Sequence, residues 1–292
     1  MTQQQLLDKI NVYERLMRLD KPIGILLLLW PTLWALCIAS RGQPDWIVVM
    51  IFVTGTALMR SAGCVMNDIA DRKYDGLVER TKNRPLATGE VSVKEAYLLA
   101  GVLSLVAFSL VLFLNKTTIY LSFAALFLAF TYPLTKRFLA IPQAYLGVAF
   151  GFGIPMVFAA ITNSVPYLAW LLLLANVFWA IAYDTEYAMV DREDDLKIGI
   201  KSSAIFFGEF DVAAIMLCYL AMLIILIYIG RQLHMSQYYY LGLSAAFCLA
   251  IMQYYLIRKR LNHLCFKAFL SNNWIGCAVF SGLAANYVKV AF

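Results

Sequence analysis

Two clusters of acidic side chains hold the residues of this sequence that are best suited to chemistry. Of the eighteen acidic residues, six lie between positions 68 and 95 and eight between positions 184 and 211. Helix capping and solvated surface charge are the ordinary explanations for a single cluster of this kind. Two clusters, each running on from a long apolar segment, favour a shared site for a cation.

The spacing within each cluster is helical. The first cluster reads NDIADRKYD over 67–75, and 3.6 residues per turn predict that Asn67, Asp71 and Asp75 stack on one helical face. The second cluster contains DREDD over 191–195, and steps of seven and four place three of its carboxylates on one face: Asp184, Asp191 and Asp195. Because carboxylates four residues apart repel one another, the pattern predicts a cationic species between them.

Magnesium is the cation that suits these donors. Mg²⁺ prefers hard oxygen ligands and is usually bound by one or two carboxylates together with waters and phosphate oxygens. Two facing clusters would hold a diphosphate through bridging Mg²⁺ and help it to leave. Three basic residues, Arg72, Lys136 and Arg137, would neutralise the remaining phosphate charge. The alternative for Lys136 and Arg137 is an anchor at the membrane surface.

Arg60 is a charged residue inside an otherwise apolar segment, seven residues before Asn67. An arginine within a membrane helix is costly and is therefore usually functional. One interpretation is that Arg60 binds an anionic group of a substrate. The other is that it forms an ion pair with an acidic residue of another helix.

The elements that must position these residues are membrane helices. The chain has 292 residues, of which 62% are hydrophobic and 14% charged, with a mean hydropathy of +0.72; a soluble domain would have about 25% charged residues. A helical span needs about 20 mostly apolar residues. The sequence predicts an all-α fold, a bundle of nine transmembrane helices that forms one domain over 1–292. The predicted spans are 22–40, 46–67, 96–114, 117–135, two within 138–183 separated by a turn at 162–166, 212–230, 232–257 and 268–288.

The basic residues predict the orientation of this bundle. Nineteen of the 24 Lys and Arg fall in the N-terminal segment and in every second connection, whereas four fall on the opposite side. By the positive-inside rule, the N-terminus and both acidic clusters lie on the cytoplasmic side, and an odd number of spans puts the C-terminus on the opposite side. No cleavable signal peptide is indicated. The net charge of +6 reflects this asymmetry, and no nucleic-acid partner is expected.

These motifs resemble those of the UbiA superfamily of intramembrane aromatic prenyltransferases, and the resemblance covers essentially the whole chain. The family pattern Asn-Asp-x-x-Asp-x-x-x-Asp stands at 67–75 and Asp-x-x-x-Asp stands at 191–195, both without departure. Further segments are similar to the family members that use 4-hydroxybenzoate, among them LLLLWPTLWAL (26–36), KNRPLATGEVS (82–92) and AYDTEYAMVDREDDLKIGIKS (182–202).

The resemblance implies a membrane enzyme of ubiquinone biosynthesis in a bacterial inner membrane, so that the C-terminus would lie in the periplasm. It would transfer a polyprenyl group from polyprenyl diphosphate to the ring carbon ortho to the hydroxyl of 4-hydroxybenzoate, with Mg²⁺ as cofactor. The implied Mg²⁺ and diphosphate ligands are Asn67 and the catalytic aspartates Asp71, Asp75, Asp191 and Asp195. Arg72, Lys136 and Arg137 would contact phosphate, and Arg60 would face the carboxylate of the acceptor. Asp68 and Asp184 are further candidates for the site.

Two alternatives remain open at this point. The first keeps the superfamily and changes the acceptor to a naphthoate, homogentisate or a porphyrin-type ring. The second is a secondary transporter, whose distinguishing feature would be carboxylates near the bilayer midplane within broken helices.

Overall fold

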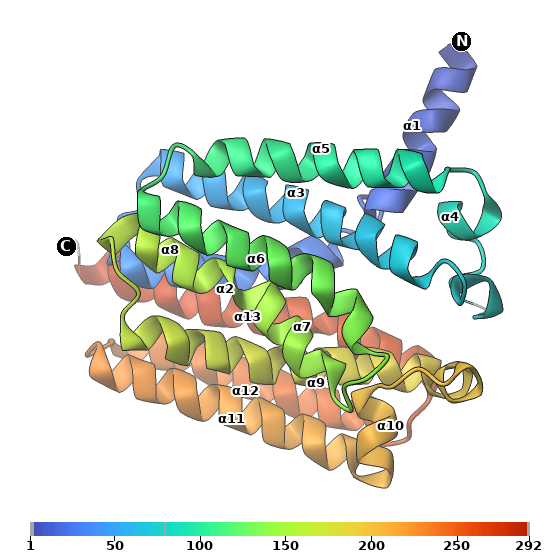
Figure 1. Cartoon of the computed structure of the whole chain (residues 1–292). Helices are drawn as coiled ribbons and strands as arrows, with labels where there is room; N and C mark the ends of the chain where they lie inside the picture. The colour runs from blue at the N-terminus through green and yellow to red at the C-terminus, as the bar shows by residue number, and fades with distance from the viewer. Residues whose placement is uncertain (1–2, 79, 291–292) are drawn as a thin grey trace.

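The structure is a computed structural model that describes residues 3–78 and 80–290, and these residues form helices joined by short connections. The two residues at each end of the predicted domain, 1–2 and 291–292, lie outside the described part. Long helices run side by side through the molecule (Figure 1). Their bounds are α2 (Ile23–Ala39), α3 (Trp46–Asp71), α5 (Val93–Val111), α6 (Lys116–Thr135), α7 (Pro142–Gly151), α8 (Gly153–Thr162), α9 (Tyr167–Ile198), α11 (Asp211–Gln232), α12 (Gln237–Ile257) and α13 (Asn262–Val290).

Seven helical segments of the described chain are long and apolar enough to cross a membrane. In these, α7 and α8 together make one segment, and α11 is extended by α10 (Ser203–Phe207) and η2 (Gly208–Phe210). The seven correspond to seven of the nine predicted spans. The other two predictions correspond to α2, an apolar helix of 17 residues, and to the 29-residue α13. The chain is a multi-pass membrane protein.

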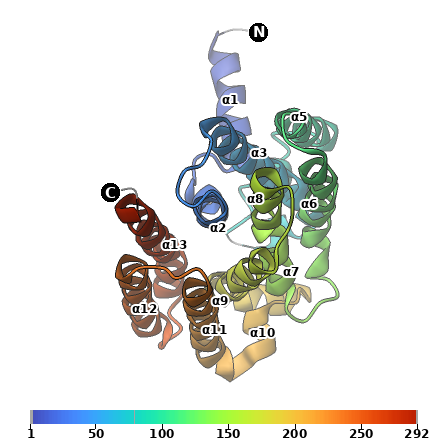
Figure 2. The same cartoon turned by 90° about the vertical axis from the view of Figure 1, so that its left-hand side faces the viewer.

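The acidic clusters come to one end of this bundle. Figure 1 shows α1 (Gln3–Met17), α4 (Pro85–Thr88) and α10 at its right-hand end, whereas α13 finishes at the left-hand end. Figure 2 looks along the bundle and shows α5 and α6 on one side, α12 and α13 on the other, and α2, α8 and α9 between them. The C-terminal ends of α3 and α9, which carry the acids, therefore lie at the same end of the bundle.

The main hydrophobic core is formed mostly by α2, α8, α9, α11, α12 and α13 and contains a polar clamp. Trp34 and Trp179 stack with ring centroids 5.3 Å apart. The Oδ1 atom of Asn272 accepts a hydrogen bond from Trp179 at 3.0 Å and lies 2.8 Å from the Tyr219 hydroxyl. Its Nδ2 donates to Glu186 at 2.8 Å. Because a buried polar group without a partner is costly, this clamp fixes α9 against α11 and α13.

One predicted span is interrupted. The helical segment 142–162 breaks at Phe152, where α7 ends and α8 begins. A Cβ added at Gly151 would lie 2.4 Å from the Asn176 Nδ2, so the missing side chain permits the close approach of α7 to α9. The same amide donates to the carbonyl of Gly147 at 2.9 Å. The helix bends here because Pro155 has no N–H for the carbonyl of Gly151 and its ring crowds that carbonyl, and the close contact with α9 holds α7 in place beyond the bend.

A second, smaller hydrophobic cluster lies at the charged end. It joins α1 to α3 and α5 through the fully buried Leu16, which packs with Val65, Ile69 and Val91. The helix α1 runs across the direction of the spans (Figure 1). Its position is fixed by surface contacts with α5, where Lys9 pairs with Glu95 at 2.7 Å. This cluster supports the connection 72–92 that follows the first acidic motif.

Candidate active site at the charged end of the bundle

The first acidic motif is only partly helical. Asn67 and Asp71 lie in the last turns of α3, on one face as predicted, but α3 ends at Asp71 and Asp75 opens the separate 3-10 helix η1 (Asp75–Leu77). The predicted three-residue stack is therefore wrong at Asp75. The Tyr74 N–H donates to the Asp71 carbonyl at 2.7 Å and closes a tight turn, and Gly76, a poor helix former, follows.

The second motif is helical throughout. The helix α9 continues to Ile198 and ends at Gly199, which has a left-handed φ of 72° and serves as its C-terminal cap. Asp184, Asp191 and Asp195 therefore lie on one continuous helix with the predicted steps of seven and four.

Basic residues hold the acids of the two motifs. Lys136, at the end of α6, pairs with Asp71. Arg80 forms a two-pronged ion pair with Asp191, with Nε 3.0 Å from Oδ1 and Nη2 2.6 Å from Oδ2. Because Arg80 follows the first motif in the chain and binds the second, it links the two acidic clusters directly.

Arg84 holds the remaining acids of the first motif. Its Nη1 lies 2.9 and 3.0 Å from the two carboxylate oxygens of Asp75 and 3.1 Å from the Oδ1 of Asp68. Burial raises the pKa of Asp75 above its usual value, against the opposing effect of Arg84. A carboxyl in this setting gains from a bound cation.

Arg80 and Arg84 were missed as site residues by sequence reasoning. They lie in a connection without periodicity, and the available signal was the six basic residues between 72 and 94. Burial would lower the pKa of Arg80, but Tyr187, Asp191 and Asp75 outweigh it and raise that pKa. Its guanidinium also lies 4.6 Å from the centre of the Tyr187 ring. Arg80 is therefore a firmly held cation between the two motifs.

The other predicted phosphate ligands lie at the rim of this site. Arg137 donates from Nη2 to the carbonyl of Ala70 at 2.7 Å, which joins the end of α6 to the end of α3. Arg72 caps α3 and is exposed. In the described part of the chain Asp195 forms no ion pair, although the charges of Lys136 and Arg80 act on it. Asp184 lies seven residues before Asp191 on α9, about two turns deeper in the bundle.

The donors fit Mg²⁺ that is shared with a phosphate group. Within 3–78 and 80–290, no three Asp, Glu, His or Cys side chains form a cluster that could hold a metal ion by themselves. Asp71 Oδ1 is buried and has no hydrogen-bond partner among the described residues, so it is an open acceptor. Since Mg²⁺ commonly takes one or two carboxylates and completes its shell with water and phosphate oxygens, the separated carboxylates suit this mode of binding.

Arg60 lies below this site, inside the bundle. Its guanidinium contacts the Cys64 thiol and lies 5.5 Å from the centre of the Phe150 ring. A Cβ at Gly24 would lie 2.5 Å from Nη2, so α2 approaches it closely. The described residues offer Arg60 no ion pair, and its buried Nε has no hydrogen-bond partner. The alternative of an interhelical ion pair is therefore not supported.

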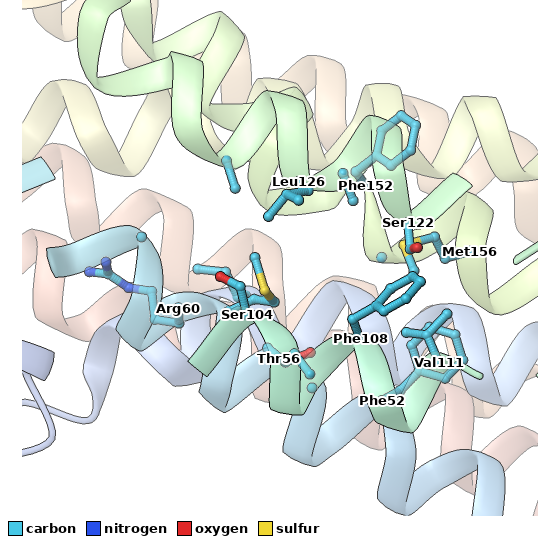
Figure 3. A pocket seen from close by; sticks show the side chains of 18 of the residues that line it. Phe52, Thr56, Arg60, Ser104, Phe108, Val111, Ser122, Leu126, Phe152 and Met156 are labelled. Atoms are coloured by element: carbon cyan, nitrogen blue, oxygen red, sulfur yellow. The ribbon is translucent and has the colours of Figure 1, made fainter. Parts of the chain in front are cut away.

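An apolar chamber of about 390 Å³ extends from Arg60 toward the opposite end of the bundle. Its walls come from α2, α3, α5, α6, α7 and α8. Figure 3 shows Arg60 at one end of the chamber and Phe52 and Val111 at the other, with Ser104 and Leu126 between. One charged group thus faces a long apolar space directly beneath a charged site.

The comparisons with known proteins agree with this arrangement. The sequence pattern of the UbiA prenyltransferase family matches residues 28–276. The chain belongs to this family. A 4-hydroxybenzoate octaprenyltransferase of Methylobacillus flagellatus is 65% identical over 283 residues, which cover 97% of this chain and 96% of the relative. The enzyme of the same name from an Azoarcus species is 63% identical over 281 residues, covering 96% and 98%.

Solved UbiA structures share the fold of this UbiA-family chain. A UbiA homolog from Aeropyrum pernix, solved in the apo form, has a TM-score of 0.74 and 23% identity over 92% of this chain and 98% of its own. A UbiA homolog from Archaeoglobus fulgidus, bound to GPP and Mg²⁺, has a TM-score of 0.67 and 20% identity over 92% of this chain and 99% of its own.

The UbiA-family site does not have the feature expected of a secondary transporter. The broken span of this chain turns at 151–153, a Gly-Phe-Gly sequence without a charged group. The paired acids instead lie at the ends of α3 and α9 and in the adjoining connection.

Proposed function

We propose that this protein transfers a polyprenyl group from polyprenyl diphosphate to the ring carbon ortho to the hydroxyl of 4-hydroxybenzoate, releasing diphosphate. The proposal rests on the order of three regions along the bundle. Ion pairs lie at one end, the Arg60 Nε without a hydrogen-bond partner among the described residues lies below them, and an apolar chamber lies beyond. A prenyl diphosphate has the same order of charged head and apolar tail. The two bacterial relatives named above support the choice of acceptor.

The charged end would bind the diphosphate and its metal. Asn67, Asp71, Asp75, Asp191 and Asp195 would hold Mg²⁺, which when bound supplies positive charge to the departing diphosphate. In the structure Lys136 and Arg80 occupy two of these carboxylates. We infer that both cationic side chains turn to phosphate oxygens when the donor binds, which leaves Asp71 and Asp191 free to bind Mg²⁺.

Arg72 and Arg137 would add positive charge at the rim of the diphosphate. Arg84 would stay on Asp75, because it contacts that carboxylate through a single nitrogen and leaves acceptor positions free for the metal. The reaction breaks the bond between the allylic carbon and the diphosphate oxygen, and the electron pair leaves with the diphosphate. Preorganised charges that match the transition state contribute the most to catalysis of this kind, and the loss of one commonly lowers the rate by about 10²–10³. Asp68 and Asp184 would support this charged region rather than bind the donor directly.

Arg60 would bind the carboxylate of 4-hydroxybenzoate and so point the ring toward the allylic carbon. A guanidinium suits a carboxylate because it offers a planar pair of donors. The new carbon–carbon bond forms at the ring carbon next to the phenol, and loss of the proton from that carbon restores aromaticity. The Phe150 ring beside Arg60 limits the space for larger acceptors.

The orientation in the membrane is part of the proposal. The N-terminus and the acid–base site would face the cytoplasm, and α13 would end in the periplasm of a bacterial inner membrane, as the distribution of basic residues favours. Fusion of a reporter that is active only in the periplasm to the C-terminus tests this topology, and activity of the same reporter at the N-terminus would contradict it.

The decisive experiment is an assay of the purified protein in detergent with Mg²⁺ and geranyl diphosphate. The acceptors are 4-hydroxybenzoate, a dihydroxynaphthoate and homogentisate, and the products are identified by mass spectrometry. We expect a mono-prenylated 4-hydroxybenzoate that disappears in excess chelator. Prenylation of another ring with 4-hydroxybenzoate inert would change the acceptor, and the absence of any product would reject the reaction.

A further inference from the structure

Asp68 is a fully buried acid of the first motif that is not among the proposed Mg²⁺ ligands. Its exposed fraction is 0%, and Nη2 of Arg18 lies 2.7 and 3.0 Å from its two carboxylate oxygens. The Oδ1 atom also lies 3.1 Å from Nη1 of Arg84. With both oxygens engaged by arginines, Asp68 acts within an ionic network of the protein.

Arg18 is held rigidly at the end of α1. Its φ is 59°, a left-handed value that few non-glycine residues adopt unless their surroundings impose it. Its Nη1 donates to the carbonyl of Arg15 at 2.9 Å, and the Leu19 N–H donates to the Glu14 carbonyl at 3.0 Å. Two residues earlier, the buried Leu16 anchors α1 in the smaller hydrophobic cluster. The guanidinium of Arg18 is thus presented to Asp68 in one fixed position.

The network reaches the site through Arg84, which Asp68 and Asp75 share. The same nitrogen of Arg84 contacts both carboxylates, at 3.1 Å and at 2.9 Å. Of the two ion pairs that the described residues give to the buried carboxylate of Asp68, the one with Arg84 would remain if Arg18 were absent. Because an unpaired buried charge is strongly unfavourable, Arg84 would then move toward Asp68 and away from Asp75.

We propose that Arg18 is a positioning residue for the reaction: by neutralising Asp68, it keeps Arg84 on Asp75 and so fixes the carboxylate of Asp75 at the diphosphate end of the site. The inference rests on the proposed function. Arg18 lies ahead of residues 28–276, the part that matches the family pattern. The segment before the first span therefore takes part in the site without touching the substrate.

The test uses the full-length protein in lipid nanodiscs and compares Arg18→Ala with wild type. We expect the KM for the prenyl diphosphate and the Mg²⁺ concentration for half-maximal rate to rise about tenfold, the loss expected for one weakened charged contact. The KM for 4-hydroxybenzoate should not change, because Arg60 is not in the network. Titration of Mg²⁺ with inorganic pyrophosphate, followed by calorimetry, should show a similar loss of affinity without turnover.

Two further variants separate positioning from a general loss of structure. The double variant Arg18→Ala with Asp68→Asn removes the charge that competes for Arg84, so it should recover most of the lost pyrophosphate affinity. Arg15→Ala is the matched control, because Arg15 lies on the same helix and pairs with the surface Glu90; its constants should equal those of wild type.

Three results would overturn the proposal. The first is an Arg18→Ala protein whose KM values and Mg²⁺ requirement equal those of Arg15→Ala. The second is an equal rise in the KM for the prenyl diphosphate and the KM for 4-hydroxybenzoate. The third is a double variant that binds pyrophosphate more weakly than Arg18→Ala. If Arg18→Ala does not fold, Arg18→Lys takes its place and should raise the KM for the prenyl diphosphate and the Mg²⁺ requirement by a smaller factor. Wild-type values in Arg18→Lys would then overturn the proposal. A wild-type protein that prenylates no acceptor would instead reject the proposed function, and the pyrophosphate titration would still test the network.

Discussion

The role of Arg60 leads to a prediction that separates the two substrates. Arg60 lies at the end of the apolar chamber with one buried donor, Nε, that has no partner among the described residues. A hydrogen bond between charged groups is worth about 1.5–3 kcal/mol. At about 1.4 kcal/mol per tenfold change, Arg60→Ala should raise the KM for 4-hydroxybenzoate roughly 10- to 150-fold. The KM for the prenyl diphosphate should stay within a factor of about two, because the diphosphate is proposed to bind to the acidic and basic residues at the charged end of the bundle and not to Arg60.

The assay measures initial rates in detergent with each substrate varied in turn, and it includes 4-hydroxybenzamide as a neutral acceptor. Wild type should prefer the carboxylate over the amide, and Arg60→Ala should lose that preference. Arg60→Lys keeps the positive charge but lacks the planar pair of donors, so its preference for the carboxylate over the amide should lie between those of wild type and Arg60→Ala. A variant that loses affinity equally for donor and acceptor, or that still prefers the carboxylate, would refute the role of Arg60 in acceptor binding.

Five other substitutions test the rest of the site and the bundle. Asp71→Asn and Asp191→Asn should each lower kcat by at least about 10²–10³ while the protein still inserts and purifies; full activity of either, or activity in excess chelator, would contradict the two-motif site. Arg80→Ala should lower kcat/KM for the donor about 10- to 100-fold, as expected for a lost charged contact, and an unchanged value would exclude it from the site. Met156→Trp should narrow the chamber and so lower kcat/KM for a long prenyl donor more than kcat/KM for geranyl diphosphate. If the ratio of these two values does not change, the prenyl chain does not bind in this chamber. Asn272→Leu should lower the thermal unfolding temperature in detergent, because it strands several buried groups at about 1–3 kcal/mol each, and an unchanged temperature would show that the polar clamp adds no stability.

Hydropathy and spacing predicted the bundle and most of the site because both depend on patterns along a single helix. The nine apolar segments match the positions of the long helices, and α9 carries Asp191 and Asp195 as the seven-and-four steps require. The prediction failed where the chain leaves the helix. Asp75 lies beyond the end of α3, because the turn after Asp71 and Gly76 stop the helix.

The partners of the acids could not be predicted in the same way. Arg80 and Arg84 lie in a connection whose path depends on packing between α1, α3 and α5. Neither periodicity nor composition says which acid each of them meets. The bend between α7 and α8 is one that the sequence does indicate, since Pro155 has no N–H to donate to the carbonyl of Gly151, four residues earlier. The contact of Gly151 and Gly147 with Asn176 of α9, by contrast, could not be predicted from the sequence.

The ion pair between Arg80 and Asp191 joins positions that lie 111 residues apart. A ribosome completes α3 and the following connection long before it reaches α9, so the early half of the protein enters the membrane with its basic and acidic groups still lacking their later partners. The site can close only after α9 has been inserted next to the helices made before it. Completion of the charged end is thus a late step of biogenesis, and a nascent chain halted before α9 has two of the four aspartates proposed as Mg²⁺ ligands, Asp71 and Asp75.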